Sequence, residues 1–112
     1  MHVFCVYNEK VNIKIQKEAA MTQRLELDRS RIDEIDEQIA ALFEKRFAIV
    51  RDIIEYKIEN RLPILDTTRE KQIIERNAAY IEDDDIRVYF RKLYGAMLEL
   101  SREYQDDIIR EK

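Results

Sequence analysis

Three cationic side chains interrupt or flank an apolar pattern in the first half of the chain: Arg29, Arg46 and Lys57. Arg46 lies between Leu42 and Ile49, at a position where the pattern predicts another Leu or Ile. Lys57 follows 11 residues later, which at ~100° per residue returns to within ~20° of the same helix face, ~16 Å away. Because a buried, unpaired cation costs several kcal/mol, this face should meet an anion or a paired carboxylate. For either residue alone, an internal salt bridge or a side chain reaching solvent is the simpler alternative.

Arg29 cannot serve the same ligand on a single helix. It precedes Arg46 by 17 residues, which corresponds to ~25 Å along a helix and a rotation of roughly 100°. If all three cations serve one site, Arg29 must come from a second chain. An antiparallel dimer would place the beginning of one helix beside the middle of the other.

Polar residues also interrupt the apolar pattern near the end of the sequence. Ser101 and Gln105 are spaced i, i+4, and they share a face with Tyr94, Leu98 and Ile108. Inward hydrogen-bonding groups need partners, which can be each other, the backbone or a ligand. Gln105 can both donate and accept, which suits an ether or carboxylate oxygen.

Asp66, Arg69 and Glu70 complete the candidate set. Helix capping explains Asp66 and Glu70, whereas a cation at Arg69 opposes the helix dipole near an N-terminus. The set contains no nucleophile–base pair, metal-binding cluster or Gly-rich phosphate loop, and His2 is the only histidine, so no metal or cofactor is expected. Such residues could clamp a dianion and stabilise charge that separates within it, as a unimolecular rearrangement requires. They are poorly suited to covalent or hydrolytic chemistry.

The apolar pattern predicts a long helix that carries the three cations. Residues 25–59 contain no Gly or Pro and have apolar residues at helical spacing, which predicts about ten turns. We expect this helix to begin near residues 22–28 and to fray at Asn60. Residues 1–20 have short β-prone runs, so we expect an N-terminal appendage of unknown role that is β-like rather than disordered. Met21 is then a possible native start, and residues 21–112 form the functional domain.

Two shorter helices are expected to follow. Pro63 favours an extended connector, and a second helix should start at Asp66 or Thr67, because Thr67 and Glu70 have the spacing of a capping box. Acidic residues 82–85 would cap a third helix over about 86–109. Its expected inward residues are Phe90, Tyr94, Met97, Leu98, Tyr104 and Ile108.

Composition supports an all-α domain. The 112 residues include one Gly and one Pro, and the charged residues (39%) alternate in sign along the chain, as on solvated helix faces. A net charge of -4 argues against nucleic acid as a partner. No apolar run approaches ~20 residues, so neither a membrane span nor a signal peptide is expected. The single cysteine, Cys5, fits a reducing compartment, and we expect a cytoplasmic protein.

The length of the first helix favours a homodimer. At about 35 residues it would be ~50 Å long, too long for its apolar stripe to be covered by two shorter helices of the same chain. Pairing with the long helix of a second copy would bury the remainder. A helical dimerisation module without chemistry is the alternative that this pattern alone leaves open.

Several short motifs, in this order and at these spacings, resemble the helical (type II) chorismate mutases over about residues 25–106. They are Leu27-Asp28-Arg29-Ser30-Arg31-Ile32-Asp33-Glu34-Ile35-Asp36, Glu44-Lys45-Arg46, Lys57, Pro63-Ile64-Leu65-Asp66-Thr67-Thr68-Arg69-Glu70 and Ser101-Arg102-Glu103-Tyr104-Gln105. The resemblance implies an intertwined all-α homodimer with three helices per chain and two active sites. It also implies the Claisen rearrangement of chorismate to prephenate, the branch step toward phenylalanine and tyrosine.

The resemblance further implies a role for each cation of the long helix. Arg46 would bind the carboxylate of the enolpyruvyl side chain, and Arg29 of the other chain would bind the ring carboxylate. Lys57 and Gln105 would hydrogen-bond the ether oxygen, where negative charge grows as the C–O bond breaks.

The same resemblance assigns the remaining candidates. Glu70 would accept the hydrogen bond of the ring hydroxyl, helped by the backbone near Asp66, while Arg69 and Ser101 would complete the carboxylate contacts. Because the sequence ends soon after Gln105, we expect a monofunctional enzyme without a fused domain. Isochorismate-pyruvate lyase, which resembles this scaffold and its cationic clamp, is the nearest alternative, although Glu70 favours the mutase. A non-catalytic dimer would not explain why polar side chains occupy inward positions together.

Overall fold

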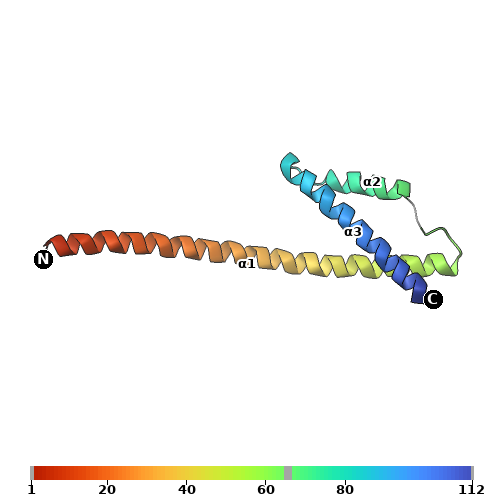
Figure 1. Cartoon of the computed structure of the whole chain (residues 1–112), viewed down its shortest axis with the longest axis horizontal. Coiled ribbons are helices and arrows are strands. Elements are labelled where there is room, and N and C mark those ends of the chain that lie inside the picture. Colours follow the sequence, from red (N-terminus) through yellow and green to blue (C-terminus); the bar gives the residue numbers. More distant parts are fainter. Residues whose placement is uncertain (1, 65–66, 112) are drawn as a thin grey trace. The chain divides into compact units, whose positions relative to one another are not determined.

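The computed structural model describes the backbone of residues 2–64 and 67–111, and the side chains of residues 10–64 and 68–111. This part of the chain contains three helices and no strand (Figure 1). They are α1 (His2–Glu59), α2 (Thr67–Ala78) and α3 (Asp84–Glu111). The prediction of an all-α chain with a long first helix and two shorter ones is therefore confirmed.

Helix α1 begins about 20 residues earlier than predicted, because the structure is already helical at His2. The expectation of β-like structure in residues 1–20 is wrong. This segment contains no Gly or Pro, and its β-branched residues lower helix propensity only slightly. An isolated strand pair, by contrast, is marginally stable at best. That residues 1–20 are an appendage distinct from a domain starting at 21 stays a prediction.

The chain divides into two units, Met1–Phe43 and Glu44–Lys112. In the first unit, the described residues belong to α1, and the apolar stripe is open to solvent. Its Leu and Ile side chains are 53–64% exposed, and they are Leu25, Ile32, Ile35, Ile39 and Leu42. The stripe is thus helical as predicted, and the described residues of the single chain do not cover it.

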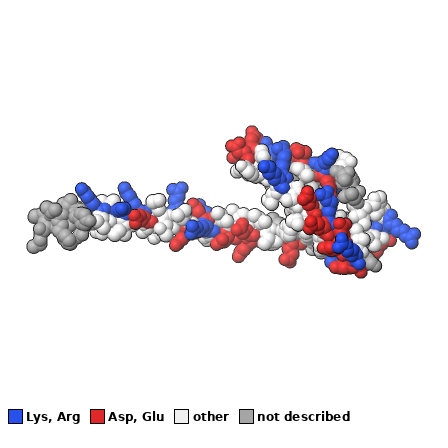
Figure 2. Space-filling view, viewed as in Figure 1, with Lys and Arg blue, Asp and Glu red and all other residues white. Residues whose placement is uncertain are grey.

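The second unit contains the end of α1 together with α2 and α3 (Figure 1). The buried apolar residues of its described part come from all three helices, and they are Ile54, Ala78, Leu98 and Ile108. All six residues expected to face inward on α3 are buried or half-buried, as predicted. The ring of Tyr104 stacks on Phe47 of α1, with 5.3 Å between centroids. Charges of both signs are mixed on the visible surface, as the alternating sequence predicts (Figure 2).

An ion pair between Arg51 and Glu111 joins α1 to the end of α3, and Arg51 also pairs within α1. Arg51 donates to Glu55 at 3.1 Å and to Glu111 at 2.9 Å. Hydrogen bonding to Tyr104, and then to the Glu111 and Glu55 carboxylates, raises the pKa of Arg51. Its positive charge therefore persists at any pH at which the protein is folded.

Local hydrogen bonds end α1 and begin α3. The amide of Leu62 donates to the carbonyl of Lys57 at 2.9 Å, and the amide of Arg61 donates to Ile58 at 3.3 Å. Arg61 has a φ of 53°, so α1 ends in a Schellman motif with an arginine at the left-handed position that usually holds glycine. The prediction that α1 ends at about residue 60 is confirmed. At α3, Asp83 caps the N-terminus by accepting from the amides of residues 85 and 86 at 2.8 and 3.1 Å, so an acidic cap from residues 82–85 is also confirmed.

Candidate active site

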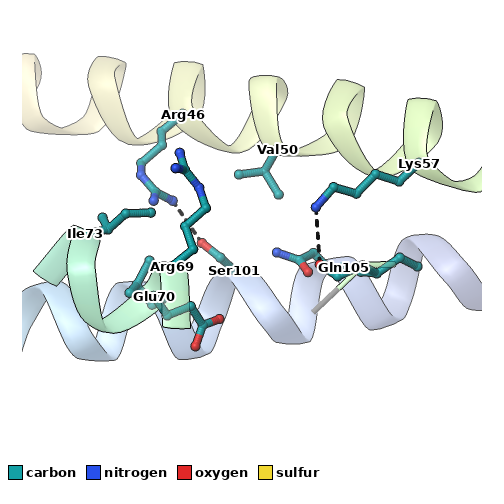
Figure 3. Close-up of a pocket in the computed structure, with 10 residues that line it drawn as sticks. Arg46, Val50, Lys57, Arg69, Glu70, Ile73, Ser101 and Gln105 are labelled. Atoms are coloured by element: carbon teal, nitrogen blue, oxygen red, sulfur yellow. Dashed lines mark hydrogen bonds between the residues drawn. The ribbon is translucent and has the colours of Figure 1, made fainter. Parts of the chain in front are cut away.

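One cavity of about 120 Å³ lies in the second unit, among the described residues of all three helices. Its volume is far above the ~15 Å³ that a single water needs, so it is more than a packing defect. The lining residues are Arg46, Val50, Lys57, Ile64, Arg69, Glu70, Ile73, Leu98, Ser101 and Gln105 (Figure 3). Six of the eight sequence-predicted site residues are therefore brought together here.

Helix α1 supplies Arg46 and Lys57, whose side chains reach into the same cavity (Figure 3). Arg46 is half-buried, and its Nη1 donates to the hydroxyl of Ser101 at 3.1 Å. Lys57 is also half-buried, and its Nζ donates to the backbone carbonyl of Ile64 at 3.4 Å, which is a long hydrogen bond. Within the described part of the chain, neither cation pairs with a carboxylate.

Helix α3 supplies Ser101 and Gln105. Ser101 is 3% exposed, and its buried hydroxyl is satisfied by the guanidinium of Arg46. Gln105 is half-buried and lines the cavity, but it makes no hydrogen bond to the described residues. An amide in that position is available to a ligand, since half-buried polar groups otherwise pair with protein or water.

Helix α2 supplies Arg69 and Glu70. Arg69 lines the cavity, and its side chain extends toward Arg46 (Figure 3). The carboxylate of Glu70 is turned away from Arg46 and Lys57, and it accepts a hydrogen bond from Arg102 of α3 at 2.7 Å. The capping box expected for Glu70 depends on Thr67, whose side chain lies outside the described residues.

Two predicted site residues are not part of this cavity. Asp66 lies outside the described residues. Arg29 belongs to the first unit, is exposed, and is not among the residues that line the cavity. Its assignment to the site of a second chain stays a prediction.

Sequence reasoning missed three side chains that hold the site residues. The hydroxyl of Tyr94 accepts from Arg46 at 3.4 Å and from Asn77 at 3.2 Å, and Arg102 pairs with Glu70. In the sequence, Tyr94 belongs to an apolar run. The available signal is that it shares a helix face with Ser101. Asn77 and Arg102 lie on charged, mostly exposed stretches, which carried no such signal.

The cavity is lined by cations and hydrogen-bonding groups, together with the carboxylate of Glu70. The described residues contain no group of three His, Cys, Asp or Glu side chains that could hold a metal ion. None of the described helices combines the length and the apolarity needed to cross a membrane. The fold and the cavity thus define an all-helical protein, over the described residues, with a pocket lined by cationic side chains from more than one helix.

Comparison with known proteins identifies the family. The sequence model of the family described as chorismate mutase type II matches residues 28–106. The chain is 30% identical over 95 residues to a chorismate mutase of Methanocaldococcus jannaschii, and the match covers 81% of this chain and 93% of the relative. This protein therefore belongs to the type II chorismate mutase family.

A second relative is much longer than this chain. The chain is 35% identical over 74 residues to a bifunctional chorismate mutase/prephenate dehydratase of Buchnera aphidicola subsp. Schizaphis graminum. That match covers 65% of this chain and 19% of the relative's length. No solved structure matches the chain significantly.

Proposed function

We propose that this protein is a chorismate mutase, which rearranges chorismate to prephenate on the route to phenylalanine and tyrosine. One observation carries the proposal: Arg46 and Lys57 face a common cavity, half-buried, and neither pairs with a carboxylate of the described chain. Cations in this state favour an anionic ligand, because burial without a counter-ion is costly. Chorismate carries two carboxylates, and the relatives named above supply the activity as a hypothesis for this chain.

The proposed mechanism needs no covalent step by the protein. In the Claisen rearrangement the ether C–O bond breaks while a C–C bond forms, within one molecule. The protein must hold the substrate in a compact conformation and stabilise the negative charge that grows on the ether oxygen. Lys57 and Gln105 are the proposed donors to this oxygen, and Gln105 is suited to it because it has no protein partner among the described residues.

The remaining side chains would bind the substrate's other polar groups. Arg46, with Arg69 and Ser101 beside it, would bind the carboxylate of the enolpyruvyl side chain. Glu70 would accept the hydrogen bond of the ring hydroxyl, and the ion pair with Arg102 holds its carboxylate in position. The backbone near Asp66 would assist Glu70.

A homodimer would complete the site. The open apolar stripe of α1 is the surface that a second copy would cover, since large exposed apolar stripes mark interaction surfaces. In an antiparallel pairing, Arg29 of one chain would reach the ring carboxylate bound by its partner. Each active site of the proposed dimer would then contain residues of both chains.

The direct test is to incubate the purified protein with chorismate and, separately, with isochorismate, and to identify the products. Prephenate from chorismate supports the proposal. Pyruvate release from isochorismate, without prephenate formation, would show a lyase instead. No reaction with either compound would favour a non-catalytic dimer.

A mixing experiment tests the shared site. Arg29→Ala and Lys57→Ala homodimers should each be nearly inactive, since both of their sites are damaged. After random reassociation of equal amounts, half of the dimers are hybrids with one intact site, so activity should return to about a quarter of the wild-type value. If hybrids form and activity does not return, Arg29 does not act across the interface.

A further inference from the structure

A tyrosine hydroxyl outside the cavity links the Arg46 guanidinium to helix α2. Arg46 Nη2 donates to the hydroxyl of Tyr94 at 3.4 Å, and the Tyr94 ring lies 5.6 Å from the guanidinium carbon. Asn77 Nδ2 donates to the same hydroxyl at 3.2 Å. All three side chains are half-buried. Tyr94 does not line the cavity, so it would act on a ligand only through Arg46.

The two amide hydrogens of Asn77 have separate acceptors. One N–H of the Asn77 amide is bound to the backbone carbonyl of Ile73 at 2.8 Å, which leaves the other for Tyr94. The Tyr94 oxygen therefore accepts from two sides, and its position is fixed by α2 as well as α3. Arg46 Nη1 is held separately by Ser101. Both terminal nitrogens of the guanidinium are thus bound to residues of one face of α3, seven positions apart.

We propose that Tyr94 is a positioning residue for Arg46, and that Asn77 holds the Tyr94 hydroxyl in place for this purpose. The inference rests on the proposed function, in which Arg46 binds a substrate carboxylate. A guanidinium that is already directed when the substrate arrives loses less conformational freedom on binding. Because Arg46 would hold the same carboxylate in the substrate and in the transition state, the benefit belongs to substrate affinity, not to the chemical step.

Tyr94→Phe tests the role of the hydroxyl, because it removes one oxygen and keeps the ring against Arg46. Since the hydrogen bond is long, we expect KM for chorismate to rise about 5-fold. The value of kcat should stay within about 2-fold, as expected for loss of binding common to the ground and transition states. Tyr89→Phe is the matched control: Tyr89 lies on the same helix, is 70% exposed and has a cation, Lys92, 5.8 Å from its ring. Its kinetic constants should not change.

A double-mutant cycle tests whether Asn77 acts through Tyr94. Asn77→Ala alone should raise KM about 2–3-fold, and it should add nothing in the Tyr94→Phe background, because coupled residues are not additive. Additive effects, or an unchanged KM in Tyr94→Phe, would overturn the inference. A fall in kcat at constant KM, accompanied by lower thermal stability, would show a structural role instead.

Nitrogen NMR of the Arg46 side chain gives a readout that needs no substrate. In the wild type, bonding of both terminal nitrogens should slow guanidinium rotation and separate their signals, and Tyr94→Phe should bring them together. If the signals separate as expected but the wild type does not convert chorismate, the proposed function fails while Tyr94 still positions Arg46. If the separation between the two nitrogen signals is the same in the wild type and in Tyr94→Phe, Tyr94 does not hold the guanidinium.

Discussion

Replacement of Ser101 by alanine separates the function of the cavity from the stability of the fold. Ser101 is buried on α3 and accepts a hydrogen bond from Arg46 at 3.1 Å. The substitution removes one oxygen atom and leaves a side chain that any helix accepts. Arg46 keeps its contact with Tyr94 at 3.4 Å, so the guanidinium loses one of two protein partners.

The expected magnitudes follow from these contacts. A hydrogen bond to a charged group is worth about 1.5–3 kcal/mol. Arg46 is half-exposed toward the cavity, so water can replace the lost partner and the lower end applies. A loss of about 1.4 kcal/mol corresponds to about a tenfold fall in kcat/KM. The free energy of unfolding should change by less than about 1 kcal/mol, because alanine favours the helix by a few tenths of a kcal/mol and offsets part of the lost hydrogen bond.

The assay compares steady-state conversion of chorismate with chemical denaturation of the same preparations. Glu99→Ala, an exposed change to alanine on the same helix, controls for helix propensity and should leave kcat/KM unaltered. Ser101→Ala with wild-type kcat/KM and wild-type stability would refute the idea that Ser101 holds Arg46 for substrate. A large loss of stability would show that the hydroxyl is needed mainly for packing.

Three further outcomes are expected. Arg102→Ala should lower kcat/KM severalfold by releasing Glu70. Arg91→Ala breaks a similar α3-to-α2 ion pair outside the cavity and should leave kcat/KM unchanged. Each substitution should lower the free energy of unfolding by at most about 1 kcal/mol in denaturation experiments. The wild type should stay active to moderately high pH, and Gln105→Glu should be active only when the new carboxyl is protonated, so its pH–rate profile should fall as pH rises above about 4–5. A wild-type profile that collapses near pH ~5–6 would contradict the first half of this expectation. Arg61→Gly should raise the free energy of unfolding by about 0.5–1 kcal/mol, because glycine adopts a positive φ without strain, and a decrease would contradict this reading of the helix end.

Much of the fold follows from the helical spacing of apolar residues and from two signals that mark helix boundaries. Pro63 and the acidic cap around Asp83 divide the chain into the three observed helices. The beginning of α1 was not predictable in the same way, because residues 11–15 alternate apolar and polar side chains as a strand does. The alternating pattern had less effect on the secondary structure of this segment than the absence of Gly and Pro, and the segment is helical. The end of α1 was located correctly, but its left-handed residue is Arg61, which no propensity scale would select.

The candidate site was predictable where a polar side chain interrupts an apolar run. Arg46, Lys57, Ser101 and Gln105 stood out for this reason, and they share one cavity. Partners such as Arg102 were missed, because a charged residue on a partly exposed helix face does not differ from its neighbours in sequence. The contact that singles it out lies 32 positions away in the chain.

The end of α1 gives Lys57 two attachments to the same connector. Its backbone carbonyl accepts from the amide of Leu62, and its ammonium donates to the carbonyl of Ile64. Lys57 therefore binds the connector through both its backbone and its side chain. An anion that attracts the ammonium would compete with the Ile64 carbonyl for it and would leave the Leu62 bond in place. Occupancy of the cavity would then release the Ile64 carbonyl from the ammonium, while the helix end at Leu62 stays closed.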